Sequence, residues 1–254
     1  MSNGPPVQPA NPFRGLVTYE REDQDVLFGR DREASLLEGR LLSSSTTLLF
    51  SGSGVGKSSF LRAKFIPEVE SVYTVCAYAE WSDKDPYAAL VESVRRQLHV
   101  DGDGSIQSAF ASAAPKPGLL VLDQFEELFQ YHRETEQFAS LIGQLGLIVA
   151  DHATDIRLLL SMREEFLGDL SACDSVLPDL FNNYYRLRNP SVPLAATIVR
   201  KTAETVHVEC DPAGLELLIQ DLKMSARPAN PTSAVAQQSV AVSYTHLDVY
   251  KRQW

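Results

Sequence analysis

Long apolar runs, paired cysteines and a basic stripe are all missing from this chain of 254 residues. No apolar run approaches the length of a membrane span, so we expect no membrane-spanning segment. The three cysteines, Cys76, Cys173 and Cys210, lack C-x-x-C spacing, which favours free thiols over a disulfide framework or a zinc site. Residues 1–10 have neither the basic nor the apolar part of a signal peptide. These absences predict a cytosolic protein with no membrane partner.

Positive charge is also scarce, since the net charge is -10 and the isoelectric point is near 5.0. A nucleic-acid-binding surface normally carries a basic stripe, so this balance argues against a nucleic-acid partner. Hydrophobic residues make up 44% of the chain. That share is enough for one sizeable core, with or without a small appended domain.

The most informative stretch spans residues 46–61 and reads TTLLFSGSGVGKSSFL. An apolar run leads into a glycine-rich turn, then Lys-Ser, then an apolar-periodic segment, and this order predicts a strand, a phosphate loop and a helix. Backbone N–H groups of such a loop bind phosphate, Lys57 reaches the β- and γ-phosphates, and the Ser58 hydroxyl binds Mg²⁺. The residues expected to bind the nucleotide are Ser53, Gly54, Val55, Gly56, Lys57, Ser58 and Ser59.

One position departs from the P-loop pattern G-x-x-x-x-G-K-[ST], because Ser51 stands where the first glycine is expected. Gly52 and Gly54 keep the loop flexible, so we interpret the serine as a tolerated variant. The alternative is a surface turn of small residues that happens to precede Lys-Ser. The strand and helix patterns on either side favour the phosphate loop.

A second element of the candidate site is the apolar run 119–122, which ends in Asp123. Continuous apolar runs of this kind are typical of buried parallel strands, and ligands gather at the carboxyl ends of such strands. We expect Asp123 to hold Mg²⁺ opposite Ser58. The alternative is a carboxylate that merely ends a strand.

Hydrolysis also needs a carboxylate that orients the attacking water. Many P-loop ATPases place a glutamate directly after the magnesium-binding aspartate, but here that residue is Gln124. We favour Glu126 as the catalytic group and keep Glu127 as the second choice. One of these two acids alternatively only complements the positive end of a helix.

Two basic positions complete the candidate site. Arg163 follows the apolar run 155–161 and is expected to sense the γ-phosphate, or else to pair with Glu164 or Glu165. The sequence Phe28-Gly29-Arg30 precedes a predicted helix. Its glycine permits a close approach of backbone to ligand, while Arg30 is alternatively a solvated residue at the helix start.

The chain predicts an α/β fold with a parallel sheet and helices on both faces, because strands and helices alternate. Strands are expected in the apolar run that begins at 46 and leads into the glycine-rich turn, and at 72–79, 119–122, 155–161 and 184–187. Helices are expected at 30–42, 58–65, 83–99, 125–150 with a break near 132, 193–206 and 212–222. Residues 101–117 are expected to form a loop around a weak helix. We expect four parts, namely a disordered lead at 1–10, a P-loop ATPase core at 11–190, a partial helical lid at 191–222 and a non-native or disordered tail at 223–254.

Together these motifs resemble the STAND class of signal-transduction ATPases, in particular the novel STAND domain of prokaryotic multidomain proteins. The resemblance covers about residues 11–222 and is carried by NPFRGL at 11–16, FGR at 28–30, the loop at 51–58, DQFEELF at 123–129 and REEF at 163–166. It implies ATP or ADP held between an AAA-like core and a helical lid, with Gly29 and Arg30 near the adenine. The related NACHT pattern implies Glu126 rather than Gln124 as the catalytic group.

What the resemblance implies is a slow, Mg²⁺-dependent ATPase that acts as a regulatory switch. Such a module rests closed with ADP, then opens and self-associates when ATP exchanges in, while flanking domains sense the signal and give the output. Two rivals remain, a nucleotide-held interaction scaffold with negligible turnover and a GTPase. The chain has no Asn-Lys-x-Asp motif to support the GTPase, and no Leu-Ser-Gly-Gly-Gln signature of a transporter-type ATPase.

The last residues of the chain differ from the rest. Residues 243–253 read SYTHLDVYKRQ and resemble the translation of sequencing-adapter read-through. We therefore expect this tail to be non-native and to contribute nothing to the fold.

Overall fold

The computed structural model describes residues 17–102, 104–113, 116–177, 179–207 and 211–225. The expected lead at 1–10, the NPFRGL sequence at 11–16, Cys210 and the tail from 226 lie outside these residues. The chain divides into two compact units. We call residues 32–53 and 64–187 the sheet unit, and residues 1–31, 54–63 and 188–254 the helical unit.

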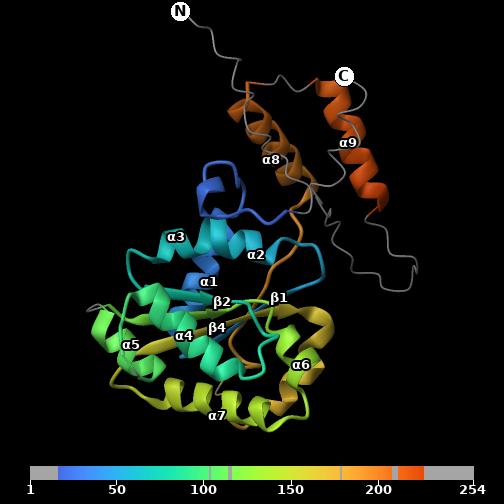
Figure 1. Cartoon of the computed structure of the whole chain (residues 1–254). Helices are drawn as coiled ribbons and strands as arrows, with labels where there is room; N and C mark the ends of the chain where they lie inside the picture. The colour runs from blue at the N-terminus through green and yellow to red at the C-terminus, as the bar shows by residue number, and fades with distance from the viewer. Residues whose placement is uncertain (1–16, 103, 114–115, 178, 208–210, 226–254) are drawn as a thin grey trace, which may run out of the picture. The chain divides into compact units, whose positions relative to one another are not determined.

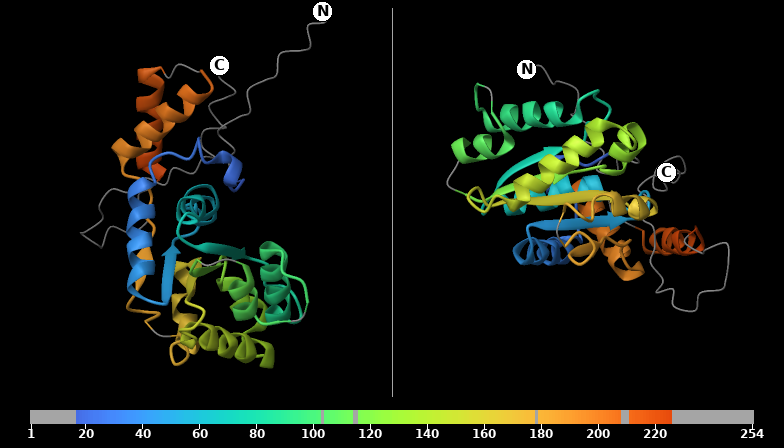
Figure 2. Two further views of the ribbon diagram at one scale, coloured as in Figure 1. Left: turned by 90° about the vertical axis from the view of Figure 1, so that its left-hand side faces the viewer. Right: turned by 90° about the horizontal axis from the view of Figure 1, so that it is seen from below.

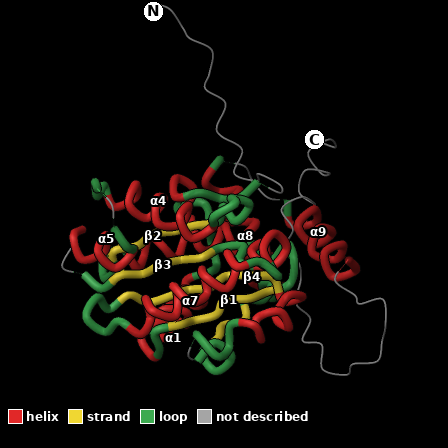
Figure 3. The backbone as a smooth tube through the Cα atoms, turned by 60° about the horizontal axis from the view of Figure 1, so that its bottom comes forward, coloured by secondary structure: helices red, strands yellow, loops and turns green. Residues whose placement is uncertain are grey.

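A five-stranded parallel sheet forms the centre of the sheet unit. Its strands are β1 (Thr46–Ser51), β2 (Thr74–Tyr78), β3 (Gly118–Leu122), β4 (Ile156–Arg163) and β5 (Tyr184–Arg186). They lie in the order β2-β3-β4-β1-β5, and all of the pairings are parallel; Figure 3 shows the first four side by side. The central strands β1, β3 and β4 are the continuous apolar runs of the sequence, buried on both sides as parallel strands require. The predicted fold class is confirmed.

One face of the sheet carries the main hydrophobic core. Alternate residues of the strands point to this face and pack against four helices, α4 (Pro86–Leu98), α5 (Ile106–Ala113), α6 (Glu126–His132) and α7 (Glu136–Ala150). Figure 1 shows α4, α5 and α7 on this one side of the strands. The core side chains of the strands are Leu48, Phe50, Cys76, Tyr78, Leu120, Leu122, Ile156, Leu158, Leu160 and Met162.

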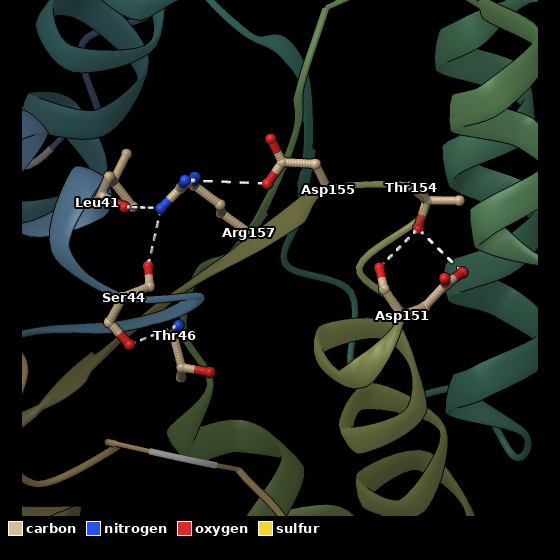
Figure 4. A network of polar contacts seen from close by, with 7 residues as sticks. All are labelled: Leu41, Ser44, Thr46, Asp151, Thr154, Asp155 and Arg157. Atoms are coloured by element: carbon tan, nitrogen blue, oxygen red, sulfur yellow. Dashed lines mark hydrogen bonds and ion pairs between the residues drawn. The ribbon is translucent and has the colours of Figure 1, made fainter.

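The opposite face is covered by α1 (Asp31–Ser43), which runs alongside β1 in both views of Figure 2. Arg157 of β4 fixes the end of this helix, since its guanidinium donates to the carbonyls of Leu41 and, at 3.2 Å, Ser44. The same guanidinium lies 3.8 Å from the Asp155 carboxylate (Figure 4). Carbonyls at a helix end have no partner within the helix, so a cation there stabilises it. This cluster lies at the amino end of β4, which leaves the carboxyl end of the sheet for other functions.

Asn183, which is buried directly before β5, ties α1 to β1. Its side-chain N–H groups donate to the carbonyls of Arg40 and Thr46 at 3.0 Å and to the Thr47 hydroxyl at 2.8 Å. Its side-chain oxygen accepts from the Ser43 hydroxyl at 3.2 Å. Removing this amide would leave buried acceptors without a donor, which is more costly than losing an exposed hydrogen bond.

We therefore expect Asn183→Ala to lower the free energy of unfolding by about 2–3 kcal/mol. Urea denaturation measures this change. The matched control is Ser43→Ala, which removes an exposed hydroxyl that donates to the Arg40 carbonyl and to the amide oxygen, and it should cost less than about 1 kcal/mol. Equal losses for the two variants would contradict this role of Asn183.

The helical unit contains α2 (Lys57–Phe60), α8 (Val192–Thr205) and α9 (Pro212–Ser225), preceded by a 3₁₀ turn at Arg21–Asp23. The latter two helices contact each other. Beyond α2 the chain stays helical through a π-helical turn (Leu61–Phe65) and α3 (Ile66–Val69). The expected end of this helix near residue 65 was therefore too early. None of the described helices is long and apolar enough to cross a membrane.

The end of the fourth strand also differs from expectation. β4 extends to Arg163, which makes this arginine the last residue of the strand and not the first after it. A 3₁₀ helix (Glu164–Ala172) follows directly.

Of the cysteines in the described part of the chain, Cys76 and Cys173 are buried free thiols, and burial raises the pKa of each to about 12.

Candidate functional site

Two glycines shape the loop that follows β1. Gly54 and Gly56 have φ of +76° and +91°, in the left-handed region that side chains disfavour. Gly56 immediately precedes α2, and its carbonyl accepts a 2.9 Å hydrogen bond from the Phe60 N–H. A turn of this kind that leads into a helix presents backbone N–H groups to an anion. The loop therefore has the glycines where its backbone needs them.

Ser51, the departure from the P-loop pattern, lies where glycine is not required. It is the last residue of β1, fully buried and in register with Arg163 of β4. Its hydroxyl donates to the Gly52 carbonyl at 2.9 Å. Any residue adopts the extended backbone of a strand. The serine is thus compatible with the loop, as the sequence analysis expected.

The helix after the loop is held by the segment that precedes α1. The Tyr19 N–H donates to the Ser59 hydroxyl at 3.1 Å, and Arg62 forms a 2.7 Å ion pair with Glu20. The Tyr19 ring is buried with Leu27 and Ala63. Ser59, predicted to bind nucleotide, thus already accepts a backbone hydrogen bond within the helical unit.

The Phe28-Gly29-Arg30 turn belongs to the same unit. The Arg30 guanidinium is buried and donates to the carbonyl of Arg188 at 2.8 Å and to that of Val55, in the phosphate loop, at 3.3 Å. The alternative of a solvated Arg30 is therefore wrong. Gly29 has φ +76°, and a Cβ there would lie 2.9 Å from Ile198 of α8. The glycine is thus needed for a close approach to a helix of its own chain.

The turn after β3 is held by the neighbouring strands. The Asp123 N–H donates to the Tyr78 carbonyl at 2.8 Å, and the Phe125 N–H donates to the Ser161 carbonyl at 2.9 Å. Between them Gln124 has φ +52°, a conformation that is uncommon for a residue other than glycine. Such backbone persists only where its surroundings fix it, and it is frequent at functional sites.

The Asp123 side chain is nearly fully buried, with 4% of its surface exposed. Its Oδ1 accepts a 2.7 Å hydrogen bond from the Ser161 hydroxyl. Its Oδ2 is buried and has no hydrogen-bond partner among the described residues. Leaving a buried carboxylate oxygen unpaired is unfavourable, whereas a hard cation takes such an oxygen as a ligand. The environment of Asp123 therefore fits a Mg²⁺ ligand.

Glu126, predicted to orient the attacking water, and Arg163, predicted to sense the γ-phosphate, pair with each other. The Arg163 Nε lies 3.0 Å from Glu126 Oε1, and the Arg163 backbone N–H donates to Oε2 at 3.2 Å. Only 2% of the Glu126 side chain is exposed, against 47% of Arg163. Glu164 instead pairs with Arg186 at 2.8 Å. The expected alternative for Arg163, an ion pair with Glu164 or Glu165, is thus replaced by a pair with Glu126.

Glu127 lies one position further along α6 and is only partly buried. Its pKa is raised, first by burial and then by the negative charge of Glu126, with a smaller rise from Asp123 and an opposing effect of Arg163. A carboxyl group with a raised pKa accepts a proton more readily than an ordinary one. Glu127 is thus more exposed than Glu126, which is buried and paired with Arg163.

These elements share one edge of the sheet. β1 and β3 flank β4 in parallel, with Ser51 opposite Arg163 and Leu122 opposite Leu160. Parallel strands present their carboxyl ends at the same edge, where ligands bind in open α/β sheets. Gly52 and Ser53, the start of the phosphate loop, therefore leave the sheet at the edge that carries Asp123.

The chain matches one family of known proteins over most of its length. A sequence model described as novel STAND NTPase 1 covers residues 12–234. The chain belongs to the novel STAND NTPase 1 family. This confirms the resemblance drawn from the motifs, and membership of an NTPase family supports nucleotide binding by a P-loop. Among curated proteins, none matches this STAND NTPase.

Solved structures of ATPases share the fold of the STAND NTPase domain. The Walker-type ATPase PABY2304 of Pyrococcus abyssi has a TM-score of 0.61 at 16% identity, over 83% of this chain and 67% of that one. The ADP form of the ORC2 protein of Aeropyrum pernix has a TM-score of 0.59 at 14% identity, over 95% and 66%. The ORC1 protein of A. pernix, in complex with DNA, has a TM-score of 0.55 at 16% identity, over 91% and 62%. The chain thus spans about two-thirds of their lengths, and at these identities the likeness shows the fold alone.

Two residues of the STAND NTPase that contact Asp123 were not predicted from the sequence. Ser161 supplies a hydroxyl, and the Trp81 indole donates to the Asp123 carbonyl at 2.8 Å. A single serine within the apolar run 158–162 was a usable signal for the first residue. Nothing in the local sequence around Trp81 indicates that it reaches Asp123, 42 residues further along the chain.

Proposed function

We propose that this domain binds ATP with Mg²⁺, hydrolyses it slowly and acts as a nucleotide-dependent regulatory switch. The observation that carries the proposal is the buried Asp123 carboxylate, whose Oδ2 has no partner in the described part of the chain. It lies at the sheet edge from which the phosphate loop departs. Membership of the novel STAND NTPase 1 family supports it. Two buried free thiols, Cys76 and Cys173, fit the reducing cytosol that we propose as its location.

Each part of the site has a proposed task. The backbone N–H groups of residues 53–59 bind the phosphates, and the Lys57 ammonium neutralises the β- and γ-phosphates. The Ser58 hydroxyl and Asp123 hold Mg²⁺, which when bound supplies positive charge that stabilises the transferring phosphoryl group. Gly29 and Arg30 are proposed to lie near the adenine, with Arg30 fixing the Val55 carbonyl of the loop.

Glu126 and Glu127 have different roles in this proposal, one in holding Arg163 and the other as the general base. Both oxygens of Glu126 already have partners on Arg163, so Glu126 is best suited to hold the arginine that senses the γ-phosphate. Glu127 is more exposed and has a raised pKa, which suits a group that accepts a proton from the attacking water. The contacts therefore favour Glu127 as the base, although the sequence favoured Glu126.

We expect Glu127→Gln to lower the rate of ATP hydrolysis by about a hundredfold, a typical contribution of a general base, while nucleotide affinity changes little. Glu126→Gln should instead weaken the response to the γ-phosphate, seen as a smaller difference between ATP and ADP affinities, because it loosens Arg163. A phosphate-release assay and calorimetric titrations measure these effects. Glu165→Gln, on the neighbouring 3₁₀ helix, is the control. If Glu126→Gln alone stops turnover, the two roles must be exchanged.

The same assay on the parent protein separates the switch from its rivals. Phosphate release above the background supports an ATPase, whereas tight ATP binding without release favours a nucleotide-held scaffold. Preference for GTP over ATP in a competition titration would favour a GTPase.

We further propose that ATP drives self-association and that flanking sensor and effector domains supply signal and output. Sedimentation of the ADP-bound and ATP-bound protein tests the self-association.

A further inference from the structure

Trp81 is a fully buried side chain in the segment that follows β2. Its ring lies between two others in edge-to-face geometry, with centroids 4.9 Å from Tyr78 and 5.4 Å from Phe125. Phe129 continues the series at 5.7 Å from Phe125. Edge-to-face contacts of this kind fix the orientation of each ring as well as burying it. The indole therefore has one position available to it.

In that position the indole N–H points to the edge of the sheet that carries Asp123. Trp81 Nε1 donates to the Asp123 carbonyl at 2.8 Å in a buried environment. The carbonyl of Trp81 in turn accepts a 2.8 Å hydrogen bond from the buried ring of His132, at the end of α6. Trp81 is thus held from both sides, by the aromatic rings and by His132, while it holds Asp123.

The Asp123 backbone needs such a partner because of the turn that follows. Gln124 adopts φ +52°, so the chain turns sharply after Asp123. The strands satisfy the N–H groups of Asp123 and Phe125, but the Asp123 carbonyl takes its hydrogen bond from Trp81. A buried carbonyl without a donor is unfavourable, so loss of the indole N–H should let the turn, and the carboxylate on it, shift.

We propose that Trp81 is a positioning residue that sets the Asp123 carboxylate for Mg²⁺. This inference rests on the proposed function, because it assumes that Asp123 is the metal ligand. Trp81 itself touches neither metal nor nucleotide; it acts through the backbone of Asp123. Loss of an ordinary core tryptophan would lower the stability of the fold and leave the Mg²⁺ dependence of binding unchanged. Loss of Trp81 should change both.

The test is Trp81→Phe in the full chain, which keeps an aromatic ring and removes the indole N–H together with part of the buried ring. Calorimetric titration with ADP in EDTA should give an affinity within about twofold of the parent, since no phosphate contact changes. The Mg²⁺ concentration that gives half of the metal effect on ADP binding should rise about fivefold to tenfold, as expected for one lost buried hydrogen bond.

The matched control is Tyr78→Phe. It removes a hydrogen bond from the same aromatic group, since the Tyr78 hydroxyl donates to the Glu80 carbonyl, and it leaves the Asp123 carbonyl paired. Urea denaturation should show that both variants are less stable than the parent. Only Trp81→Phe should shift the Mg²⁺ midpoint. Equal midpoints for Trp81→Phe and the parent would overturn the inference about Trp81 alone.

A second readout does not depend on the stability of a variant. Trp81 and Trp254 are the two tryptophans of the chain, so Trp254→Phe leaves Trp81 as the sole indole. With ADP bound, Mg²⁺ should change the Trp81 emission with the midpoint that calorimetry gives. Unchanged emission while calorimetry records Mg²⁺ binding would overturn the inference. Absence of any Mg²⁺ effect on the parent would overturn the proposed metal site together with it.

Discussion

Lys57→Ala should weaken ATP and ADP binding by about a thousandfold, because it removes charge-assisted hydrogen bonds to two phosphates, each worth roughly 1.5–3 kcal/mol. The loop itself should keep its shape, since Gly54 and Gly56 supply its left-handed residues. Calorimetric titration with each nucleotide measures the loss. The substitution removes the ammonium group that we assign to the β- and γ-phosphates.

Lys64→Ala is the control for this prediction. Lys64 lies in the same helical stretch and forms a 2.6 Å ion pair with Glu68, one turn further along. Its loss should leave nucleotide affinity unchanged, because we assign Lys64 no contact with the phosphates. The fold should also be retained, because a partly exposed ion pair of this kind contributes little to stability. Were Lys57→Ala to bind ATP as tightly as Lys64→Ala, the loop at 52–59 would not be the phosphate site.

Asp123→Asn should lower Mg²⁺-dependent hydrolysis by about a thousandfold, because metal stabilisation of the transferring phosphoryl group is worth several kcal/mol. The asparagine oxygen can still accept the hydrogen bond from the Ser161 hydroxyl, so the turn should stay intact. Affinity for ADP in EDTA should therefore match that of the parent. Phosphate release and titrations with and without Mg²⁺ measure both effects.

Asp83→Asn provides the comparison for Asp123. Asp83 is an exposed acid in the loop after β2, and its carboxylate accepts a hydrogen bond from the Asp85 N–H. Its substitution should leave the Mg²⁺ dependence as it is in the parent. Similar losses in both variants would indicate that general negative charge at this end of the protein matters, and not a ligand at residue 123.

The local sequence was enough to predict the elements that carry the site. The apolar runs before Ser51 and Asp123 predict buried strands, and the glycines at 54 and 56 predict the loop. These features depend on neighbours within a few residues, which a single sequence displays. The helix after the loop was harder to delimit, because its π-helical turn and Pro67 do not give a clear end signal.

The pairings within the site could not be predicted in this way. Arg163 selects Glu126, 37 residues away, over its neighbours Glu164 and Glu165, because only the folded sheet brings Glu126 within reach. Gly29 likewise indicated a close approach, but its partner Ile198 comes from a helix far along the chain. Spacing identifies which residues carry the chemistry, whereas tertiary packing decides which of them meet.

The central claim is that Ser58 and Asp123 act on one metal ion. A double-mutant cycle of Ser58→Ala and Asp123→Asn, read out as the Mg²⁺-dependent rate of phosphate release, tests it most directly. If both residues hold the same ion, the double variant should be little slower than Asp123→Asn alone, since the first loss already removes the metal contribution. Losses that simply multiply would mean that the two residues act independently, and would contradict a shared magnesium site.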